Sequence, residues 1–271
     1  MLPPSKFDSV EGLERFLSYD PTLRKELIVS GGEIVFRGSE DLARRRPEQV
    51  RLAADRVQLA TSFANRLVRV CPWLRIVAIS GSTAYGRPKT RDDIDFFLVT
   101  RQKRVWITLL FAMVLAKLHR MRNPSTPVYC FNRMLDESRC EDTFRTFHDP
   151  LFAREALTLR VLDGQPYYLW LLQSAIWMEE LFPAFYRQVL TRRDETEAAR
   201  ISRGPRIWSI ANWIAFVGLA PYTRLASLLR NRRLQASGNL EAQFRTVIQP
   251  GFFAYESRRF DLLRDTYRRA F

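Results

Sequence analysis

The chain has 271 residues, 46% of them hydrophobic, so it is long enough and apolar enough to bury a real core in one large domain or two smaller ones. Its 43 lysine and arginine residues exceed its 29 aspartate and glutamate residues, and the net charge of +14 favours nucleic acid, nucleotides or an anionic membrane face as partners. The three cysteines form no close pair, which argues against a disulfide framework and favours the reducing cytoplasm.

The first 39 residues indicate a small unit ahead of the main body. The start of the chain has no charged segment followed by an apolar stretch, so we expect no signal peptide. The run SVEGLERFLSY is typical of a short helix, and LIVSGGEIVF contains two β-rich runs around a Gly-Gly turn signal. Residues 1–39 therefore resemble a winged-helix-like lead-in.

The next hundred residues or so mix helix and strand patterns. Apolar residues recur with helical period over 40–70, and arginines cover the other face. The runs RIVAIS (75–80) and IDFFLVT (94–100) predict two strands, 104–120 predicts a long apolar helix, and PVYCFNRML (127–135) predicts a third strand. We expect these elements to form a small mixed sheet flanked by helices.

The stretch between the first two of these strands carries the chemistry. Ser80, Gly81 and Ser82 place backbone N–H groups and a hydroxyl at a turn where a helix begins, an arrangement that suits phosphate oxygens. Asp93 and Asp95 lie two residues apart at a strand start, so their side chains share one face while the isoleucine between them points into the core. Paired carboxylates suit Mg²⁺ or Mn²⁺, and the combination predicts metal-assisted phosphoryl or nucleotidyl transfer.

This pattern, GS followed by ten residues and then DID between apolar strands, resembles the signature of the DNA polymerase β-like nucleotidyltransferase superfamily. The layout of the chain is also similar to prokaryotic nucleotidyltransferase-domain proteins with a helical C-terminal half. The resemblance implies that Gly81 and Ser82 hold the β- and γ-phosphates of a nucleoside triphosphate such as ATP. It also implies that Asp93 and Asp95 bind two Mg²⁺ or Mn²⁺ ions that bridge the triphosphate and the acceptor.

The third carboxylate that the family usually carries is absent from the expected strand. Asn132 stands near its position, and an amide ligates a metal weakly and takes no proton at neutral pH. Three outcomes stay open: Asp136 supplies the group from the strand end, catalysis is slow, or the fold keeps nucleotide binding without transfer. Arg87, Lys89 and Arg91 in the intervening loop either neutralise triphosphate charge or stay solvated.

Helical patterns dominate after residue 140, over 151–162, 166–189, 207–229 and 257–270. The apolar stretch 207–222 is interrupted by polar and helix-breaking residues and falls short of the roughly 20 residues that span a bilayer. We therefore expect a buried helix and no transmembrane segment, although its tryptophans and flanking arginines also suit an interface.

The sequence thus predicts an α+β protein in three parts. A winged-helix-like lead-in (1–39) precedes a small mixed-sheet nucleotidyltransferase core flanked by helices (40–140), and an all-helical acceptor-binding domain (141–271) follows.

Arginine clusters spread over both halves indicate contact with a phosphate backbone, so RNA is the expected acceptor and tRNA the best single candidate. The clusters are Arg44 to Arg46, Arg192 with Arg193, Arg230 with Arg232 and Arg233, Arg258 with Arg259, and Arg268 with Arg269. Three alternatives stay open. They are a toxin or defence nucleotidyltransferase that modifies tRNA or a protein, a cyclic-nucleotide synthase, and a catalytically inactive RNA-binding relic of the fold.

Overall fold

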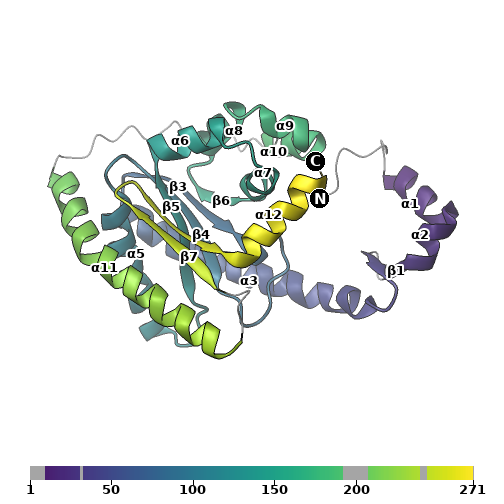
Figure 1. The fold of residues 1–271 in the computed structure, drawn as a ribbon, viewed down its shortest axis with the longest axis horizontal. Helices are drawn as coiled ribbons and strands as arrows, with labels where there is room; N and C mark the ends of the chain where they lie inside the picture. Colours follow the sequence, from purple (N-terminus) through teal and green to yellow (C-terminus); the bar gives the residue numbers. More distant parts are fainter. Residues whose placement is uncertain (1–9, 31–32, 192–206, 239–242, 271) are drawn as a thin grey trace.

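The protein is built around one mixed β-sheet with helices on both faces (Figure 1). The computed structural model describes residues 10–30, 33–191, 207–238 and 243–270. The described strands are β1 (Leu27–Ser30), β2 (Glu33–Phe36), β3 (Leu74–Ser80), β4 (Ile94–Thr100), β5 (Tyr129–Asp136), β6 (Arg160–Asp163), β7 (Phe244–Gln249) and β8 (Phe252–Ser257). The described helices are α1 (Val10–Tyr19), α2 (Pro21–Glu26), α3 (Glu40–Val70), α4 (Gly81–Ala84), α5 (Val105–Arg122), α6 (Glu137–Thr146), α7 (Pro150–Leu157), α8 (Gln165–Gln173), α9 (Trp177–Leu181), α10 (Pro183–Thr191), α11 (Ile207–Ala236) and α12 (Arg258–Ala270).

The main sheet has six described strands in the order β6-β3-β4-β5-β8-β7. β4 and β5 are parallel, with α5 connecting them, and the other neighbouring pairs are antiparallel. The strands β3, β4 and β5 are therefore central, and the turn between β3 and β4 lies at one end of the sheet.

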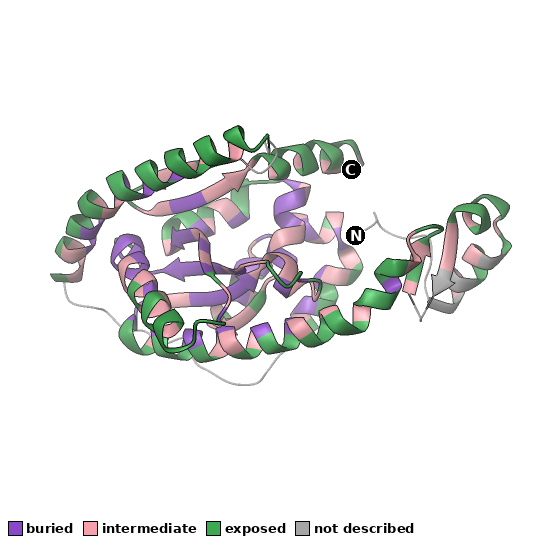
Figure 2. Cartoon of the chain, turned by 90° about the horizontal axis from the view of Figure 1, so that it is seen from below, coloured by how far each residue is buried: buried purple, intermediate pink, exposed green. Residues whose placement is uncertain are grey.

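Alternate residues of the central strands feed two apolar clusters, one on each face of the sheet. On the first face Val77, Ile79 and Phe96 are buried against α3, α5 and α11. On the second face Ile76 and Phe97 are buried against α6, α7, α8, α9 and α10. Figure 2 shows the buried residues concentrated in the sheet and on the helix surfaces that face it.

A buried asparagine joins α11 to α5. The side-chain Oδ1 of Asn212 accepts hydrogen bonds from the backbone N–H groups of Trp106 (2.8 Å) and Ile107 (3.2 Å). These N–H groups lie in the first turn of α5, where no intrahelical acceptor exists. The polar residue that interrupts the apolar sequence of 207–222 therefore caps a neighbouring helix, and α11 continues through Pro221.

The first described residues form a small unit at the far end of α3 (Figure 1). The predicted helix is α1, and the two predicted β-runs pair as the antiparallel hairpin β1–β2. A second short helix, α2, starts at Pro21, and the Asp20 side chain accepts from the N–H groups of Thr22 and Leu23.

The prediction of an all-helical domain over 141–271 is wrong. This part contributes β6, β7 and β8, and all three belong to the same sheet as the core strands. β7 and β8 form a hairpin around Pro250 and Gly251. These two residues are typical of a turn, but the hairpin was not predicted from the sequence. The helices predicted there are confirmed as α7, α8 to α10, α11 and α12, although β6 replaces the end of the first.

Within the described residues, no helix is long and apolar enough to cross a membrane.

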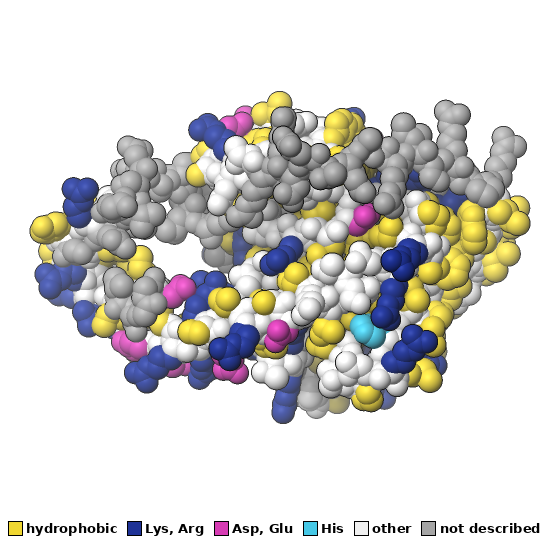
Figure 3. Space-filling view, turned by 180° about the vertical axis from the view of Figure 1, so that it is seen from behind, with side chains coloured by type: hydrophobic (Ala, Val, Ile, Leu, Met, Phe, Trp, Pro, Cys, Tyr) yellow, Lys and Arg dark blue, Asp and Glu magenta, His cyan; other side chains and the backbone are white. Residues whose placement is uncertain are grey.

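Seen from behind, the molecule carries a broad band of hydrophobic side chains over α5 and α11, with lysine and arginine side chains beside it (Figure 3).

Candidate active site

The turn after β3 brings the main chain against the second aspartate. β3 ends at Ser80, which pairs with Asp95 of β4, and the chain then enters α4 at Gly81. Gly81 has a φ of +65°, and a Cβ atom at this position would lie 2.6 Å from Oδ2 of Asp95. Only glycine fits both the backbone conformation and this close approach.

Asp93 and Asp95 face one cavity, as the strand alternation predicted. Ile94 between them is fully buried in the opposite cluster. Burial and the charge of Asp93 raise the pKa of Asp95 to about 7. Burial also raises the pKa of Asp93, although Arg230 opposes that shift. The charge of Asp93 therefore destabilises the ionised form of Asp95, and a bound cation would relieve this repulsion.

Two side chains of β5 hold Asp95 in place. β5 pairs with β4 so that Cys130 lies beside Asp95, and an irregularity in the pairing follows directly. Asn132 donates from Nδ2 to Oδ1 of Asp95 at 3.0 Å, and the Cys130 thiol also hydrogen-bonds to this carboxylate. Asn132 thus occupies the position beside Asp95 where the family resemblance leads one to expect an acid.

Asp92 organises the loop that leads into β4. Its Oδ2 accepts from the Ser82 hydroxyl at 2.9 Å and from the backbone N–H of Lys89 at 2.8 Å. The buried guanidinium of Arg56 on α3 donates from Nη2 to the carbonyl oxygens of Lys89 (2.8 Å) and Thr90 (3.1 Å). The positive charge of Arg56 also lies close enough to interact with Asp92 and Asp93. A buried arginine therefore fixes this loop and supplies positive charge behind the acids.

The cavity that Asp93 and Asp95 face has a volume of about 310 Å³, within the range of small-molecule sites. Its walls combine aromatic rings with three arginines, Arg133, Arg230 and Arg264. The Arg133 guanidinium lies 6.0 Å from the Phe252 ring centroid and interacts with the charges of Glu256 and Glu155. The cavity therefore offers three cations together with four acids, Asp93, Asp95, Glu155 and Glu256.

Helix α12 closes one side of this cavity. Asp149 caps the start of α7 by accepting from the Phe152 N–H at 2.9 Å, and its other oxygen pairs with Nε of Arg264 on α12 at 3.2 Å. Because Asp149 is buried, this ion pair is shielded from solvent and ties the last helix to the second face of the sheet.

Glu155 of α7 is a further acid in the cavity wall, and its place in the site was not predicted from the sequence. The Tyr85 hydroxyl donates a hydrogen bond to its Oε1, and burial raises the pKa of Glu155. Its charge also contributes to the raised pKa of Asp95, so the two carboxyl groups are neighbours. Glu155 lies in a helix with ordinary amphipathic spacing, and only the packing of α7 on the sheet brings it to the site.

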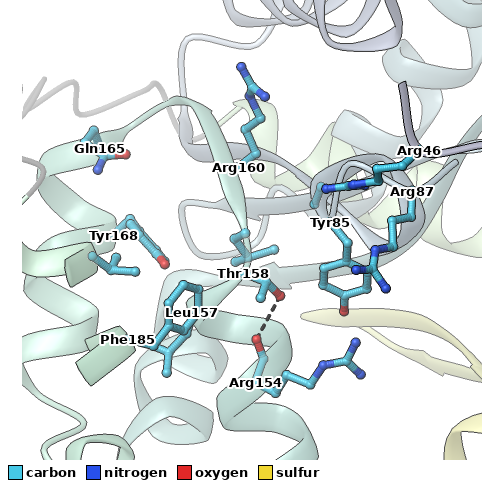
Figure 4. Close-up of a pocket in the computed structure, with 13 residues that line it drawn as sticks. Arg46, Tyr85, Arg87, Arg154, Leu157, Thr158, Arg160, Gln165, Tyr168 and Phe185 are labelled. Carbon is cyan, nitrogen blue, oxygen red and sulfur yellow. Dashed lines mark hydrogen bonds between the residues drawn. The ribbon is translucent and has the colours of Figure 1, made fainter. Parts of the chain in front are cut away.

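A second cavity of about 760 Å³ adjoins the first, and Leu159 lines both. Arg46, Arg87, Arg154 and Arg160 contribute to its wall, and none of the described residues that line it is acidic. Figure 4 shows Arg46, Arg87 and Arg154 around the Tyr85 ring, and Arg160 on the far side of Thr158. The Arg154 guanidinium lies 4.7 Å from the Tyr85 ring centroid. We call these four residues the arginine groove.

The remaining predicted residues divide into three groups. Asp136 does not reach the site, because it lies beside Thr100 at the other end of β5, about 16 Å along the sheet from Asp95. Its side chain instead caps α6 by accepting a hydrogen bond from the Arg139 N–H. Lys89 and Arg91 are exposed and line neither cavity, whereas Arg87 lines the arginine groove. The cluster of arginines at 192–193 lies outside the described residues.

The donor set fits a divalent cation only in part. Asp93 and Asp95 supply hard anionic oxygens on one face, and burial together with the charge of Asp93 raises the pKa of Asp95, a shift that a bound cation would oppose. No group of three histidine, cysteine or acidic side chains converges on one point in the part of the chain that the structure describes. The two carboxylates are therefore the ligands available, and Asn132 turns its amide nitrogen toward Asp95, so its oxygen would reach a metal only after the amide rotates.

Comparison with known proteins adds no identification: neither a family model nor a curated protein matches this chain.

Proposed function

We propose that the chain is a metal-dependent nucleotidyltransferase that moves a nucleoside monophosphate from a triphosphate to an acceptor hydroxyl. The observation that carries the proposal is the contact between the Gly81 turn and Asp95, with Asp93 and Asp95 facing one cavity. A phosphate-binding turn packed directly against paired carboxylates is what metal-assisted phosphoryl chemistry requires. This arrangement, rather than the α+β fold itself, supports the proposed reaction.

Asp93 and Asp95 would hold Mg²⁺ or Mn²⁺, and Asn132 would offer a neutral oxygen once its amide rotates. When bound, the metal orients the triphosphate and stabilises charge that develops on its oxygens. The turn at Gly81 lies against Asp95 with no side chain between them, so its backbone N–H groups would be available to phosphate oxygens held beside that carboxylate. Ser82 orders the loop through Asp92.

Glu155 is the group we propose as the proton acceptor. Neither Asn132 nor the helix-capping Asp136 suits this role. Glu155 lines the cavity, lies near Asp95, and has a raised pKa, which brings a carboxylate closer to the range where it accepts protons at neutral pH. The Tyr85 hydroxyl orients it.

RNA remains the acceptor we propose, and the arginine groove supports it. The four arginines in one wall suit the phosphates of a polyanion that runs past the cavity, although Arg46 also pairs with Glu33 (3.3 Å) and Arg154 with Glu155 (3.6 Å). Arg87 and Arg160 are exposed, and among the described residues neither side chain has a hydrogen bond or an ion pair, so both are available for contact. The RNA strand would lie along the arginine groove, while its terminal hydroxyl enters the adjoining cavity that Asp93 and Asp95 face.

The test is a transfer assay with each α-³²P-labelled nucleoside triphosphate, Mg²⁺ or Mn²⁺, and total cellular RNA. We expect label in RNA with the native chain and none with Asp93→Asn/Asp95→Asn. Label in a small product without RNA would favour cyclic-nucleotide synthesis instead. Absence of any labelled product with the native chain, together with tight RNA binding, would contradict transfer and favour an inactive binding protein.

The groove is tested separately by Arg87→Gln/Arg160→Gln. The matched control is Arg51→Gln/Arg69→Gln, two exposed arginines on α3 that line neither cavity. We expect only the groove variant to weaken RNA binding, on the order of tenfold, and to reduce its salt dependence. Equal losses in both variants would show that RNA binds the general positive field and not the groove.

A further inference from the structure

Helix α11 is apolar on two opposite sides. Its inward side buries Ala215, Ala220 and Thr223 and packs against the first face of the sheet and α5. A surface helix ordinarily turns charged residues to its other side, and a helix that is hydrophobic all round is ordinarily buried. Figure 2 shows the outer side of α11 exposed along its length.

The outer side carries large apolar residues instead of charged ones. Ile210 is 64% exposed, Trp213 64% and Ile214 62%. Spacing of three and four residues places the exposed apolar residues along one stripe. The stripe on α11 consists of Ile207, Ile210, Trp213, Ile214, Val217, Tyr222, Leu225, Leu228 and Leu229.

Helix α5 extends this apolar surface. α5 packs directly against α11, and Val114, Leu118 and Met121 recur at the same helical spacing on its exposed side. Met121 is 70% exposed. We call the exposed apolar residues of α5 and α11 together the apolar face, which corresponds to the band of hydrophobic side chains in Figure 3. Contiguous apolar surfaces of this kind mark interaction sites.

The charges on these two helices all have one sign. α5 and α11 contain no aspartate or glutamate over their combined lengths, in a chain that has 29 of them. The two helices carry seven cations: Lys117, Arg120, Arg122, Arg224, Arg230, Arg232 and Arg233. All seven are exposed, and Arg224 and Arg232 follow the helical spacing of the apolar stripe.

We propose that the apolar face is a docking site for an anionic lipid surface, with α5 and α11 lying in the plane of the interface. Apolar side chains with a tryptophan and a tyrosine, on two helices whose charged residues are all cations, are what an interfacial helix presents to acidic headgroups and acyl chains. A second copy of this chain would bring its own seven cations against these, because a two-fold contact places like surfaces together. Charge complementarity therefore favours the lipid.

The apolar face lies on the opposite side of the sheet from the candidate active site. The cluster containing α5 and α11 covers the first face, whereas the helices α7 and α12 that wall the Asp95 cavity lie on the other side of the sheet. Arg230, near the end of α11, also lines that cavity, so the variants below leave it unchanged. Docking would leave both cavities open to solvent. Lipid binding and nucleotidyl transfer are thus separable, and failure of one proposal would not affect the other.

The experiment is co-sedimentation of the full chain with vesicles of phosphatidylcholine, with and without phosphatidylglycerol. We expect binding to the anionic vesicles only, weakening as salt is raised. Ile210→Ser/Ile214→Ser/Val217→Ser should reduce that binding at least about tenfold, because three side chains that would enter the acyl region are removed. Arg224→Gln/Arg232→Gln should reduce both the binding and its salt dependence.

The matched control is Phe36→Ser/Leu42→Ser/Val50→Ser, three exposed apolar residues on β2 and α3. It should bind vesicles as the native chain does, and thermal unfolding should show that both triple variants remain folded. Trp213 fluorescence should shift to shorter wavelength with anionic vesicles, a change that Trp213→Phe removes.

Vesicle binding that survives the α11 triple variant would overturn the proposal, as would equal binding to neutral vesicles. A dimer in sedimentation velocity that the same variant abolishes, together with no vesicle binding, would show that a second copy covers the apolar face.

Discussion

Replacing Asp95 by asparagine is expected to stabilise the metal-free protein at alkaline pH. Burial and Asp93 raise the pKa of the folded-state carboxyl from 3.8 to about 7. In the unfolded chain Asp95 ionises normally, so between pH 4 and pH 7, approximately, the folded state binds more protons and loses stability as pH rises. Above that window the folded protein carries the whole cost of a buried, repelled charge. Asparagine has nearly the same shape and keeps an oxygen for Asn132.

The size of the effect follows from the shift. A change from 3.8 to about 7 at 1.36 kcal/mol per pKa unit corresponds to a ceiling of about 4 kcal/mol. Local relaxation lowers this, so we expect Asp95→Asn to raise the free energy of unfolding by about 2 kcal/mol near pH 8. Near pH 5 the folded carboxyl is protonated whereas the unfolded one is already largely ionised, so the gain should fall to about 40% of its value near pH 8.

The assay is urea denaturation with a chelator present, at both pH values. Asp136→Asn serves as the matched control, because that buried carboxylate caps α6 and accepts from Ser138 and Arg139. Because asparagine caps a helix about as well as aspartate and keeps the accepting oxygen, we expect the control to change the free energy of unfolding little at either pH. A variant at Asp95 that is less stable than the native chain near pH 8, or equally stabilised at both pH values, would refute the electrostatic reasoning.

Three further substitutions test the geometry. Gly81→Ala should lower nucleotidyl transfer on the order of 100-fold, because the added methyl group would displace the Asp95 carboxylate. The same substitution should lower the free energy of unfolding by about 1 kcal/mol. A normal transfer rate would show that the close approach of Gly81 to Asp95 is not needed. Gly164→Ala should lower the free energy of unfolding in urea by about 3 kcal/mol, because Gly164 has a φ of +85° and a Cβ there would lie 1.8 Å from the Arg75 carbonyl oxygen. A decrease below about 1 kcal/mol would contradict this packing. Asn212→Ala should cost about 2 kcal/mol, because it uncaps the buried start of α5; an unchanged thermal midpoint would argue against that cap.

The sequence was sufficient where the structure depends on local pattern. The predicted strands at 75–80, 94–100 and 127–135 are confirmed as β3, β4 and β5, and alternation along β4 correctly placed both aspartates on one face. These predictions succeed because side-chain direction along a strand has a fixed period of two.

The sequence was insufficient where the site depends on segments that are far apart in the chain. Glu155 and Arg133 reach the cavity only through the packing of α7 and the pairing of β5 with β8, contacts between residues far apart in the chain. Asp136 seemed able to complete the acid set because it follows Asn132 closely. The extended strand carries it to the opposite end of the sheet, where its oxygens cap α6.

The most direct test of the central claim is a Mn²⁺ titration followed by electron paramagnetic resonance, with and without a nucleoside triphosphate. The native chain should bind Mn²⁺ at neutral to alkaline pH, more tightly with the triphosphate, and should lose affinity on the order of tenfold from pH 8 to pH 6 as Asp95 takes up a proton. Asp93→Asn/Asp95→Asn should abolish this binding. Mn²⁺ binding that persists unchanged in the double variant would contradict the assignment of these two carboxylates as the metal site.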